Sequence, residues 1–149
     1  MHKFMWYYRG KHIKDITDFP EGAVGFVYQI QNLITERKYI GKKILKTKKT
    51  KPPLKGYKRK RVSFVESTWK TYTGSNITSK KWIIEECSRE ILHICFDKTM
   101  MSYYETKEQF KLGAIEDDSF LNDNIGGKYY RKRIETYNER YNQNKGTTR

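Results

Sequence analysis

The chain has 149 residues, of which 36% are hydrophobic and 15% aromatic, enough for one compact domain with a core rich in rings. No apolar run approaches the roughly 18 residues that a membrane-spanning helix needs, and two cysteines are too few for a disulfide framework. We therefore expect a cytoplasmic protein, with a monomer favoured, and its net charge of +14 predicts a polyanionic partner.

Three strands are predicted in the first two thirds of the chain. Residues 1–24 are interpreted as an N-terminal extension, and the alternating pattern of 25–31 predicts the first strand. After a turn, 38–41 predicts a second, antiparallel strand. The segment 89–96 has apolar residues on both faces, which is typical of a central, covered strand. Together these elements predict a domain over residues 25–130.

The positive charge is concentrated in one stretch. Between Arg37 and Arg61 lie 13 of the 31 lysines and arginines, and no acidic residue occurs from Arg37 to Val65. The segment 42–61 is too rich in Lys, Pro and Gly to be regular throughout, so we interpret it as a basic insertion. A polyanion-binding segment and a merely solvated loop are both compatible with this composition.

Helices are predicted in the second half of the chain. A short helix is expected over 78–87, followed by a longer one over 99–116 with Thr99 as its cap. Glu105 lies on or beside the apolar stripe of the longer helix, where a carboxylate needs a cation, a metal ion or solvent. Residues 131–149 are interpreted as a basic C-terminal helix or tail.

Two tyrosines stand in the adjacent predicted strands. The tripeptide Phe26-Val27-Tyr28 is followed after ten residues by Tyr39-Ile40-Gly41. This pair resembles the signature of the GIY-YIG nuclease superfamily. The second half is identical, whereas the first half keeps only the tyrosine.

Further motifs resemble the phage-encoded, homing-endonuclease-like branch of that superfamily, and in order they cover roughly residues 6–130. They are Trp6-Tyr7-Tyr8-Arg9-Gly10-Lys11, the two lysines after Tyr39-Ile40-Gly41, Trp69-Lys70-Thr71-Tyr72-Thr73-Gly74-Ser75-Asn76, Arg89-Glu90-Ile91-Leu92, Tyr103-Tyr104-Glu105 and Asn122-Asp123-Asn124-Ile125. The resemblance implies a small α+β domain, a three-stranded antiparallel sheet flanked by helices. The elements predicted above agree with it.

The resemblance also implies single-metal hydrolysis of DNA. Glu105 would bind one divalent ion, Mg²⁺ or Mn²⁺, and Tyr39 would help activate water, with Tyr28 in a shared hydrogen-bond network. Which tyrosine accepts the proton is left open. Lys42 matches a lysine beside the scissile phosphate, and Asn122 matches an asparagine near the end of the domain, with Asn124 as the competing assignment.

The family's catalytic arginine has no clear match here. Arg61 is the first choice, Arg59 the second and Lys70 a third. We expect these cations, with Lys42 and Lys43, to lower the pKa of the catalytic tyrosine. The residues expected to contact DNA are Lys43, Lys46, Lys48, Lys49, Lys58, Arg59 and Lys60.

Two rival interpretations are open at this point. Glu105-Thr106-Lys107, with Asp97 before it, has the E-x-K form of another metal-dependent nuclease superfamily, which places this motif on a strand. Alternatively, the chain is a non-catalytic nucleic-acid-binding protein that retains the fold. The resemblance suggests a phage mobile-element or DNA-degrading role in an infected bacterial cytoplasm.

Overall fold

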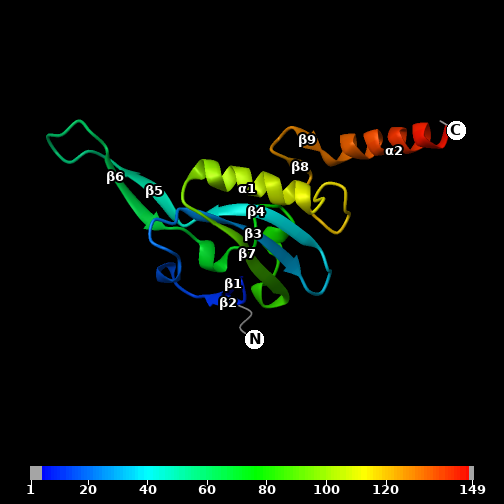
Figure 1. Cartoon of the computed structure of the whole chain (residues 1–149). Coiled ribbons are helices and arrows are strands. Elements are labelled where there is room, and N and C mark those ends of the chain that lie inside the picture. Colours follow the sequence, from blue (N-terminus) through cyan, green and yellow to red (C-terminus); the bar gives the residue numbers. More distant parts are fainter. Residues whose placement is uncertain (1–4, 148–149) are drawn as a thin grey trace.

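The computed structural model describes residues 5–147, in which a mixed five-stranded sheet is crossed by a long helix (Figure 1). The strands lie in the order β2-β1-β7-β3-β4. Their bounds are β1 Trp6–Tyr8, β2 Lys11–Ile13, β3 Gly25–Asn32, β4 Lys38–Ile44 and β7 Cys87–Cys95. The predicted α+β class is confirmed, and the three strands predicted from alternation are β3, β4 and β7.

Strand β3 is the centre of the antiparallel part of the sheet, between β4 and β7. Its side chains alternate between the faces, with Phe26 and Tyr28 on one and Val27 on the other, and all three are fully buried. The register sets Tyr28 opposite Gly41. A Cβ atom at position 41 would collide with the Tyr28 hydroxyl, so only glycine fits there.

The segment expected as an N-terminal extension contributes strands to the sheet. Strand β1 runs parallel to β7, and β2 pairs with β1 in antiparallel register. Trp6 is fully buried and donates a hydrogen bond from Nε1 to the carbonyl of Trp69 at 2.8 Å. Residues 1–4 lie outside the described residues.

Helix α1, Lys98–Lys111, covers one face of the sheet, where Met101 packs against Val27, Ile40 and Cys95. The opposite face is covered by the N-terminal segment and the loops around Trp69. The helix begins one residue before the expected cap, because the side chain of Asp97 accepts a hydrogen bond from the Met100 amide at 2.6 Å. The helix expected over 78–87 is replaced by short 3₁₀ turns, Ser79–Lys81 and Ile84–Glu86.

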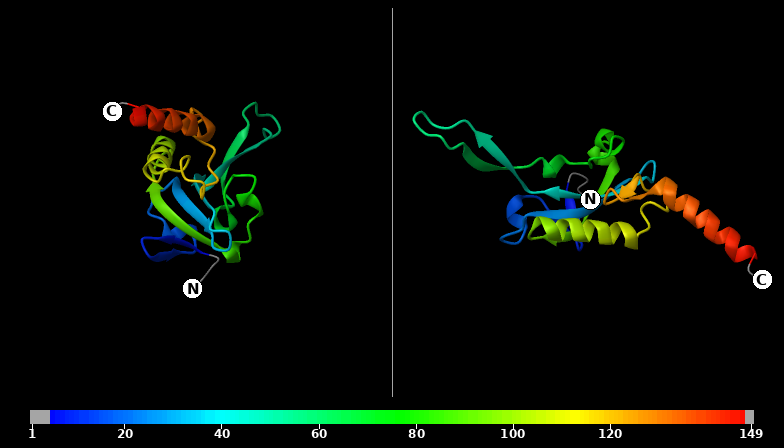
Figure 2. Two further views of the ribbon diagram at one scale, coloured as in Figure 1. Left: turned by 90° about the vertical axis from the view of Figure 1, so that its right-hand side faces the viewer. Right: turned by 90° about the horizontal axis from the view of Figure 1, so that it is seen from above.

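The basic insertion is more regular than expected. Strands β5, Lys46–Lys51, and β6, Arg61–Glu66, form a separate antiparallel hairpin that projects from the body of the molecule (Figures 1 and 2). Every residue of both strands is exposed. Strand β5 consists of lysines and threonines alone, so no hydrophobic alternation marked it in the sequence.

The C-terminal part forms a second projection. A small hairpin, β8 Asn124–Ile125 and β9 Tyr129–Tyr130, leads into helix α2, Arg131–Thr147, which extends away from the sheet (Figure 2). The guanidinium of Arg131 donates to the carbonyls of Ala114 at 2.7 Å and Phe120 at 2.9 Å, which fixes the start of α2. Within residues 5–147, no helix combines the length and hydropathy needed to cross a bilayer.

Candidate active site

The outer edge of β4 carries the candidate site. Apart from a bridge between Lys38 and Phe120, this edge pairs with no further strand among the described residues. A pocket of about 250 Å³ lies against it, with Tyr39, Glu105 and Asn122 among its lining residues. Three of the residues predicted for catalysis therefore meet at one place, although they come from a strand, a helix and a loop.

Tyr39 presents its phenol to this pocket from β4. The hydroxyl forms a hydrogen bond of 2.9 Å with Ser75 Oγ. The turn before Ser75 packs closely on the tyrosine ring at Gly74, whose φ of +105° and lack of space for a Cβ atom both require glycine. Burial raises the pKa of Tyr39, the Ser75 hydrogen bond lowers it, and the charge of Glu105 raises it.

Tyr28 lies deeper than Tyr39, and its side chain is fully buried. Its ring centroid is 6.4 Å from that of Tyr39 and 5.8 Å from that of Tyr72. Its hydroxyl is beside the Tyr72 side chain but forms no hydrogen bond of acceptable geometry with any described residue. Burial raises the pKa of Tyr28 well above its ordinary value. Among the described residues no direct hydrogen bond joins the hydroxyls of Tyr28 and Tyr39, and the shared network stays a prediction.

Both phenols have raised pKa values, contrary to our expectation that nearby cations lower them. The reason is that burial is the largest cause for both phenols, and the carboxylate of Glu105 acts in the same direction as burial.

Glu105 reaches the pocket from the middle of α1, with 22% of its side chain exposed. Burial raises its pKa, and the ammonium of Lys42, 3.9 Å away, partly opposes that rise. Among the described residues no group of three or more acidic, histidine or cysteine side chains is placed to hold a metal ion. The pocket has two carboxylates, Glu105 and Asp123, among side-chain amides, and this lining suits Mg²⁺, which keeps several waters and needs few protein oxygens.

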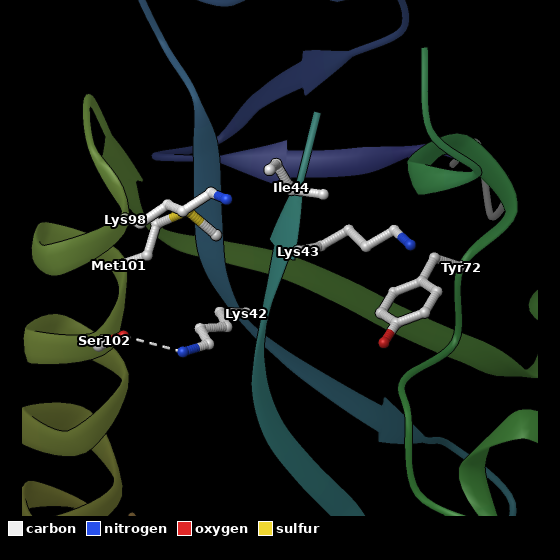
Figure 3. A pocket seen from close by; sticks show the side chains of 7 residues that line it. All are labelled: Lys42, Lys43, Ile44, Tyr72, Lys98, Met101 and Ser102. Carbon is white, nitrogen blue, oxygen red and sulfur yellow. Dashed lines mark hydrogen bonds between the residues drawn. The ribbon is translucent and has the colours of Figure 1, made fainter. Parts of the chain in front are cut away.

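Lys42 lines a second pocket of about 450 Å³ further along β4, and its ammonium is the group that lies near Glu105 of the first pocket. Its ammonium donates a hydrogen bond to Ser102 Oγ at 2.9 Å. Lys43 extends to the other side of the strand, where its ammonium lies 4.2 Å from the centre of the Tyr72 ring (Figure 3). Burial lowers the pKa of Lys43. The two lysines therefore flank the edge of β4 on opposite sides.

Asn122 lines the pocket but uses its amide to hold β4. Its Oδ1 accepts from the Ile40 amide at 3.1 Å, and its Nδ2 donates to the Ile40 carbonyl at 2.9 Å. Both ends of the side-chain amide are thus committed to backbone next to Tyr39. Asn124, the competing assignment, accepts a hydrogen bond from the Gly127 amide.

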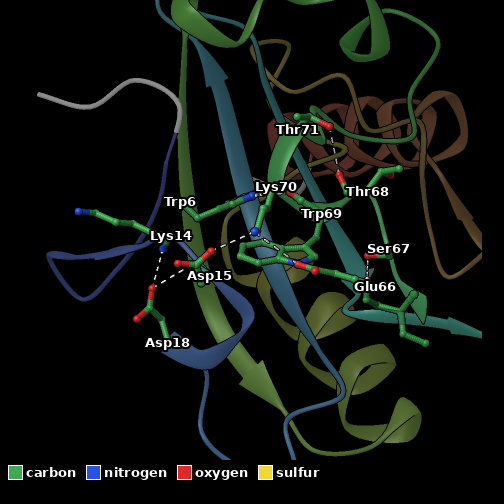
Figure 4. A network of polar contacts seen from close by, with 11 residues as sticks. Trp6, Lys14, Asp15, Asp18, Glu66, Ser67, Thr68, Trp69, Lys70 and Thr71 are labelled. Atoms are coloured by element: carbon green, nitrogen blue, oxygen red, sulfur yellow. Dashed lines mark hydrogen bonds and ion pairs between the residues drawn. The ribbon is translucent and has the colours of Figure 1, made fainter. Parts of the chain in front are cut away.

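None of the three candidates for the catalytic arginine lies in the pocket. Arg61 is opposite Lys51 in the projecting hairpin and donates to the Pro52 carbonyl, and Arg59 lies in the turn beyond it. Lys70 forms ion pairs with Asp15 at 3.0 Å and Glu66 at 3.8 Å elsewhere in the molecule (Figure 4). Within residues 5–147 no arginine lines either pocket along β4.

A buried arginine is present, but its role is in packing. Arg89 of β7 is 1% exposed, donates to the carbonyls of Lys70 and Tyr72, and lies over the Trp6 ring. Burial lowers its pKa to about 10. It therefore anchors the loop that carries Tyr72.

The E-x-K interpretation is wrong. Glu105 and Lys107 lie within α1 and Asp97 caps that helix, so the strand that this motif requires is absent. Two residues on the same face of α1 were missed, namely Ser102 and Lys98, which line the second pocket. They precede Glu105 by three and seven residues, a spacing that places all three on one helix face.

One comparison with known proteins found a match. A family model described as "Putative endonuclease segE, GIY-YIG domain" matches residues 6–134, which is more than half of the chain. Neither the curated proteins nor the solved structures gave a match.

Proposed function

The chain belongs to this SegE-type GIY-YIG family, and from that premise we propose that it hydrolyses phosphodiester bonds of DNA with the help of a divalent metal ion. The observation that carries the proposal is the meeting of Tyr39, Glu105 and Lys42 at the free edge of β4. A phenol, a carboxylate and a cation are the groups that a hydrolase needs to accept a proton, hold a metal ion and stabilise a phosphate.

We assign the role of proton acceptor to Tyr39. Its hydroxyl lines the pocket, whereas that of Tyr28 is covered by protein. The phenolate of Tyr39 would take a proton as the oxygen of water attacks phosphorus and the opposite ester oxygen leaves. Because the charge of Glu105 raises the pKa of Tyr39, neutralising that carboxylate makes the phenolate easier to form.

Glu105 would hold the metal ion, Mg²⁺ or Mn²⁺, with Asp123 as the second acidic residue lining the pocket. Such an ion supplies Lewis-acid stabilisation of charge on the phosphate. Lys42 would contact a phosphate oxygen, since its ammonium is held between Ser102 and Glu105 at the rim. Because no arginine of residues 5–147 lines the pocket, we assign this task to lysines.

The test is nicking of supercoiled plasmid by the wild type and by Glu105→Gln, with Mg²⁺ and with chelator. We expect the wild type to nick DNA only with the metal ion, and Glu105→Gln to lose a factor of at least about 10²–10³. Glu90→Gln, an equal charge change at an exposed position of β7, should retain activity. Metal-independent nicking, or full activity in Glu105→Gln, would exclude the proposal.

The second candidate is a DNA-binding protein that keeps the fold without catalysis, and the missing arginine favours it. It predicts that wild type and Glu105→Gln bind duplex DNA equally and that neither cuts it. For either function we propose a monomer in the cytoplasm of an infected bacterium, in a phage mobile-element or DNA-degrading role.

A further inference from the structure

Three cavities follow one another along the edge of β4 and onto the hairpin. The first contains Tyr39 and Glu105, and the second contains Lys42 and Lys43. The third, of about 430 Å³, lies under the hairpin. Its lining includes Ile44, Lys46, Lys48, Phe64 and Lys98. Ile44 and Lys98 also line the second cavity, so these two adjoin.

One face of the hairpin is turned toward the body of the protein and the other is turned away from it. Strand residues that pair directly share a face, so Lys46, Lys48 and Phe64 belong to one face, which we call the inner face. The third cavity is lined by these three residues, which shows that the inner face is turned toward Lys98 and the body of the protein. Lys49 and Lys51 alternate with them and belong to the outer face.

The hairpin is held in this orientation at its base. Leu45, between β4 and β5, is 2% exposed in the core. Ser67, after β6, donates from its amide to the Leu45 carbonyl at 2.8 Å and from Oγ to the Ile44 carbonyl at 2.6 Å. Glu66 accepts a hydrogen bond from Trp69 Nε1 at 2.8 Å (Figure 4). The groove between the hairpin and α1 is therefore preformed.

The chemistry of this groove fits a phosphate backbone. Five lysines and no carboxylate are found in the linings of the second and third cavities, together with the apolar ring of Phe64, which is 66% exposed. From Tyr39 to Lys48 an extended chain covers at most about 30 Å, comparable with the roughly 34–36 Å of one turn of B-DNA. The lysines are thus spread over the length of several consecutive phosphates.

We propose that one backbone strand of duplex DNA runs along this groove, from the pocket of Tyr39 and Glu105 to the inner face of the hairpin. Lys98 and Lys48 bind phosphates beyond the one that is cut, and Phe64 lies against the sugar and base surface. The outer face of the hairpin points away from the DNA. The proposal rests on the proposed function, because it gives the path of that substrate.

The test compares two double variants with the same loss of charge, both in the Glu105→Gln background so that DNA stays intact. Lys46→Gln with Lys48→Gln removes inner-face charge, and Lys49→Gln with Lys51→Gln removes outer-face charge. Affinity is measured by fluorescence anisotropy with a labelled duplex of about 30 base pairs, roughly three helical turns, over a series of salt concentrations.

We expect the inner-face variant to lose about 10–50-fold in affinity at ~0.15 M salt and its salt slope to fall by about 2, whereas the outer-face variant loses less than about threefold. Lys98→Gln, which lies on α1 rather than on the hairpin, should reduce the slope by about 1. Thermal unfolding of each variant checks that the fold is intact. Equal losses on the two faces, or a greater loss on the outer face, would overturn the proposal.

The outcomes separate this proposal from the proposed function. If the inner face dominates binding but the wild type does not cut plasmid, the groove assignment stands and the nuclease assignment fails. If the wild type cuts DNA with a metal ion and the two faces contribute equally, the groove assignment fails alone. Wild type that binds no duplex even at low salt contradicts both.

Discussion

The two signature tyrosines differ mainly in what surrounds their hydroxyl groups. The hydroxyl of Tyr39 has a partner in Ser75, whereas that of Tyr28 is buried and has none among the described residues. A buried polar group without a hydrogen bond costs on the order of 1–3 kcal/mol. The fold therefore tolerates a buried hydroxyl beneath Gly41, where the opposite strand has no side chain.

This difference predicts opposite behaviour for two matched variants. Tyr39→Phe should slow cleavage by about 10²–10⁴-fold, the usual contribution of a general base. Because the pKa of Tyr39 is raised, the wild-type rate should rise about tenfold per pH unit between roughly pH 7 and 9 as more phenolate forms, and the variant should lack this dependence.

Tyr28→Phe is the matched control. It should retain cleavage within about tenfold and raise the free energy of unfolding by ~0.5–1 kcal/mol, because it removes only the unpaired hydroxyl. Plasmid nicking against pH and thermal unfolding measure the two effects. If Tyr28→Phe lost as much cleavage as Tyr39→Phe, the role of proton acceptor would have to be assigned to Tyr28 instead.

At the scale of the elements, strand β4 is held along its outer edge by a loop. Residues 119–122 run beside its first half, where Lys38 bonds to the Ser119 carbonyl and the Leu121 amide, and Asn122 bonds to both backbone groups of Ile40. Gln109 of α1 also donates to the Ile40 carbonyl, at 3.4 Å. The strand that carries Tyr39 is thus positioned by side chains as much as by the sheet.

Asn122→Ala should lower the free energy of unfolding by about 1–3 kcal/mol, because the buried amide and carbonyl of Ile40 lose a partner. It should also slow cleavage, because the backbone that positions Tyr39 is held through the neighbouring residue Ile40. Asn124→Ala, the neighbouring assignment, should change the unfolding free energy by less than about 1 kcal/mol. Chemical denaturation of both variants distinguishes them, and equal effects would contradict the role given to Asn122.

The elements that sequence patterns predicted are those with buried faces. Strands β3, β4 and β7 were found because hydrophobic residues alternate along them or cover both faces. The hairpin of β5 and β6 lacked any buried residue to reveal it. Strands β1 and β2 have three residues each, too few for a pattern, and their place in the sheet depends on contacts with distant residues such as Trp69.

The candidate site was predictable where a motif fixed both residue and element. Tyr39 and Glu105 meet in one pocket, as the resemblance implied. Arg61 lies in the hairpin, outside the pocket, which the sequence could not predict because a run of basic residues does not show whether it folds back over the site or leaves the domain. The raised pKa values of the phenols could not be predicted from the sequence either, because burial is a property of the assembled core.

At the scale of the whole molecule, the hairpin and α2 are two arms that extend from a compact body (Figure 2). The hairpin pairs only with itself, so the body does not depend on it for folding. It holds much of the positive charge: residues 47–65 include eight lysines and arginines and no acidic residue. We therefore expect folding and the proposed DNA binding to be separable.

Replacing residues 47–65 with Asn-Gly, between the paired residues Lys46 and Glu66, should preserve the fold and lower the net charge from +14 to +6. We expect the melting temperature to change by less than about 3 °C, and the affinity for duplex DNA to fall by about 10²-fold or more at ~0.15 M salt. Calorimetry and anisotropy measure these. Unchanged affinity would show that the body binds DNA without the arm.

The outer edge of β4 also bears on whether a copy of the protein could add a strand to the sheet. An unprotected edge invites a strand of another molecule to add to the sheet. Here the backbone of Lys38 and Ile40 is occupied by residues 119–122, and Ser67 occupies the Ile44 carbonyl. The backbone groups left unpaired on this edge lie in a short stretch around Lys42. We expect this stretch to be too short to pair with an incoming strand, and the lysine charges of two copies would repel each other. The stretch that we propose to admit a nucleic acid is therefore expected to resist the addition of a strand from another copy.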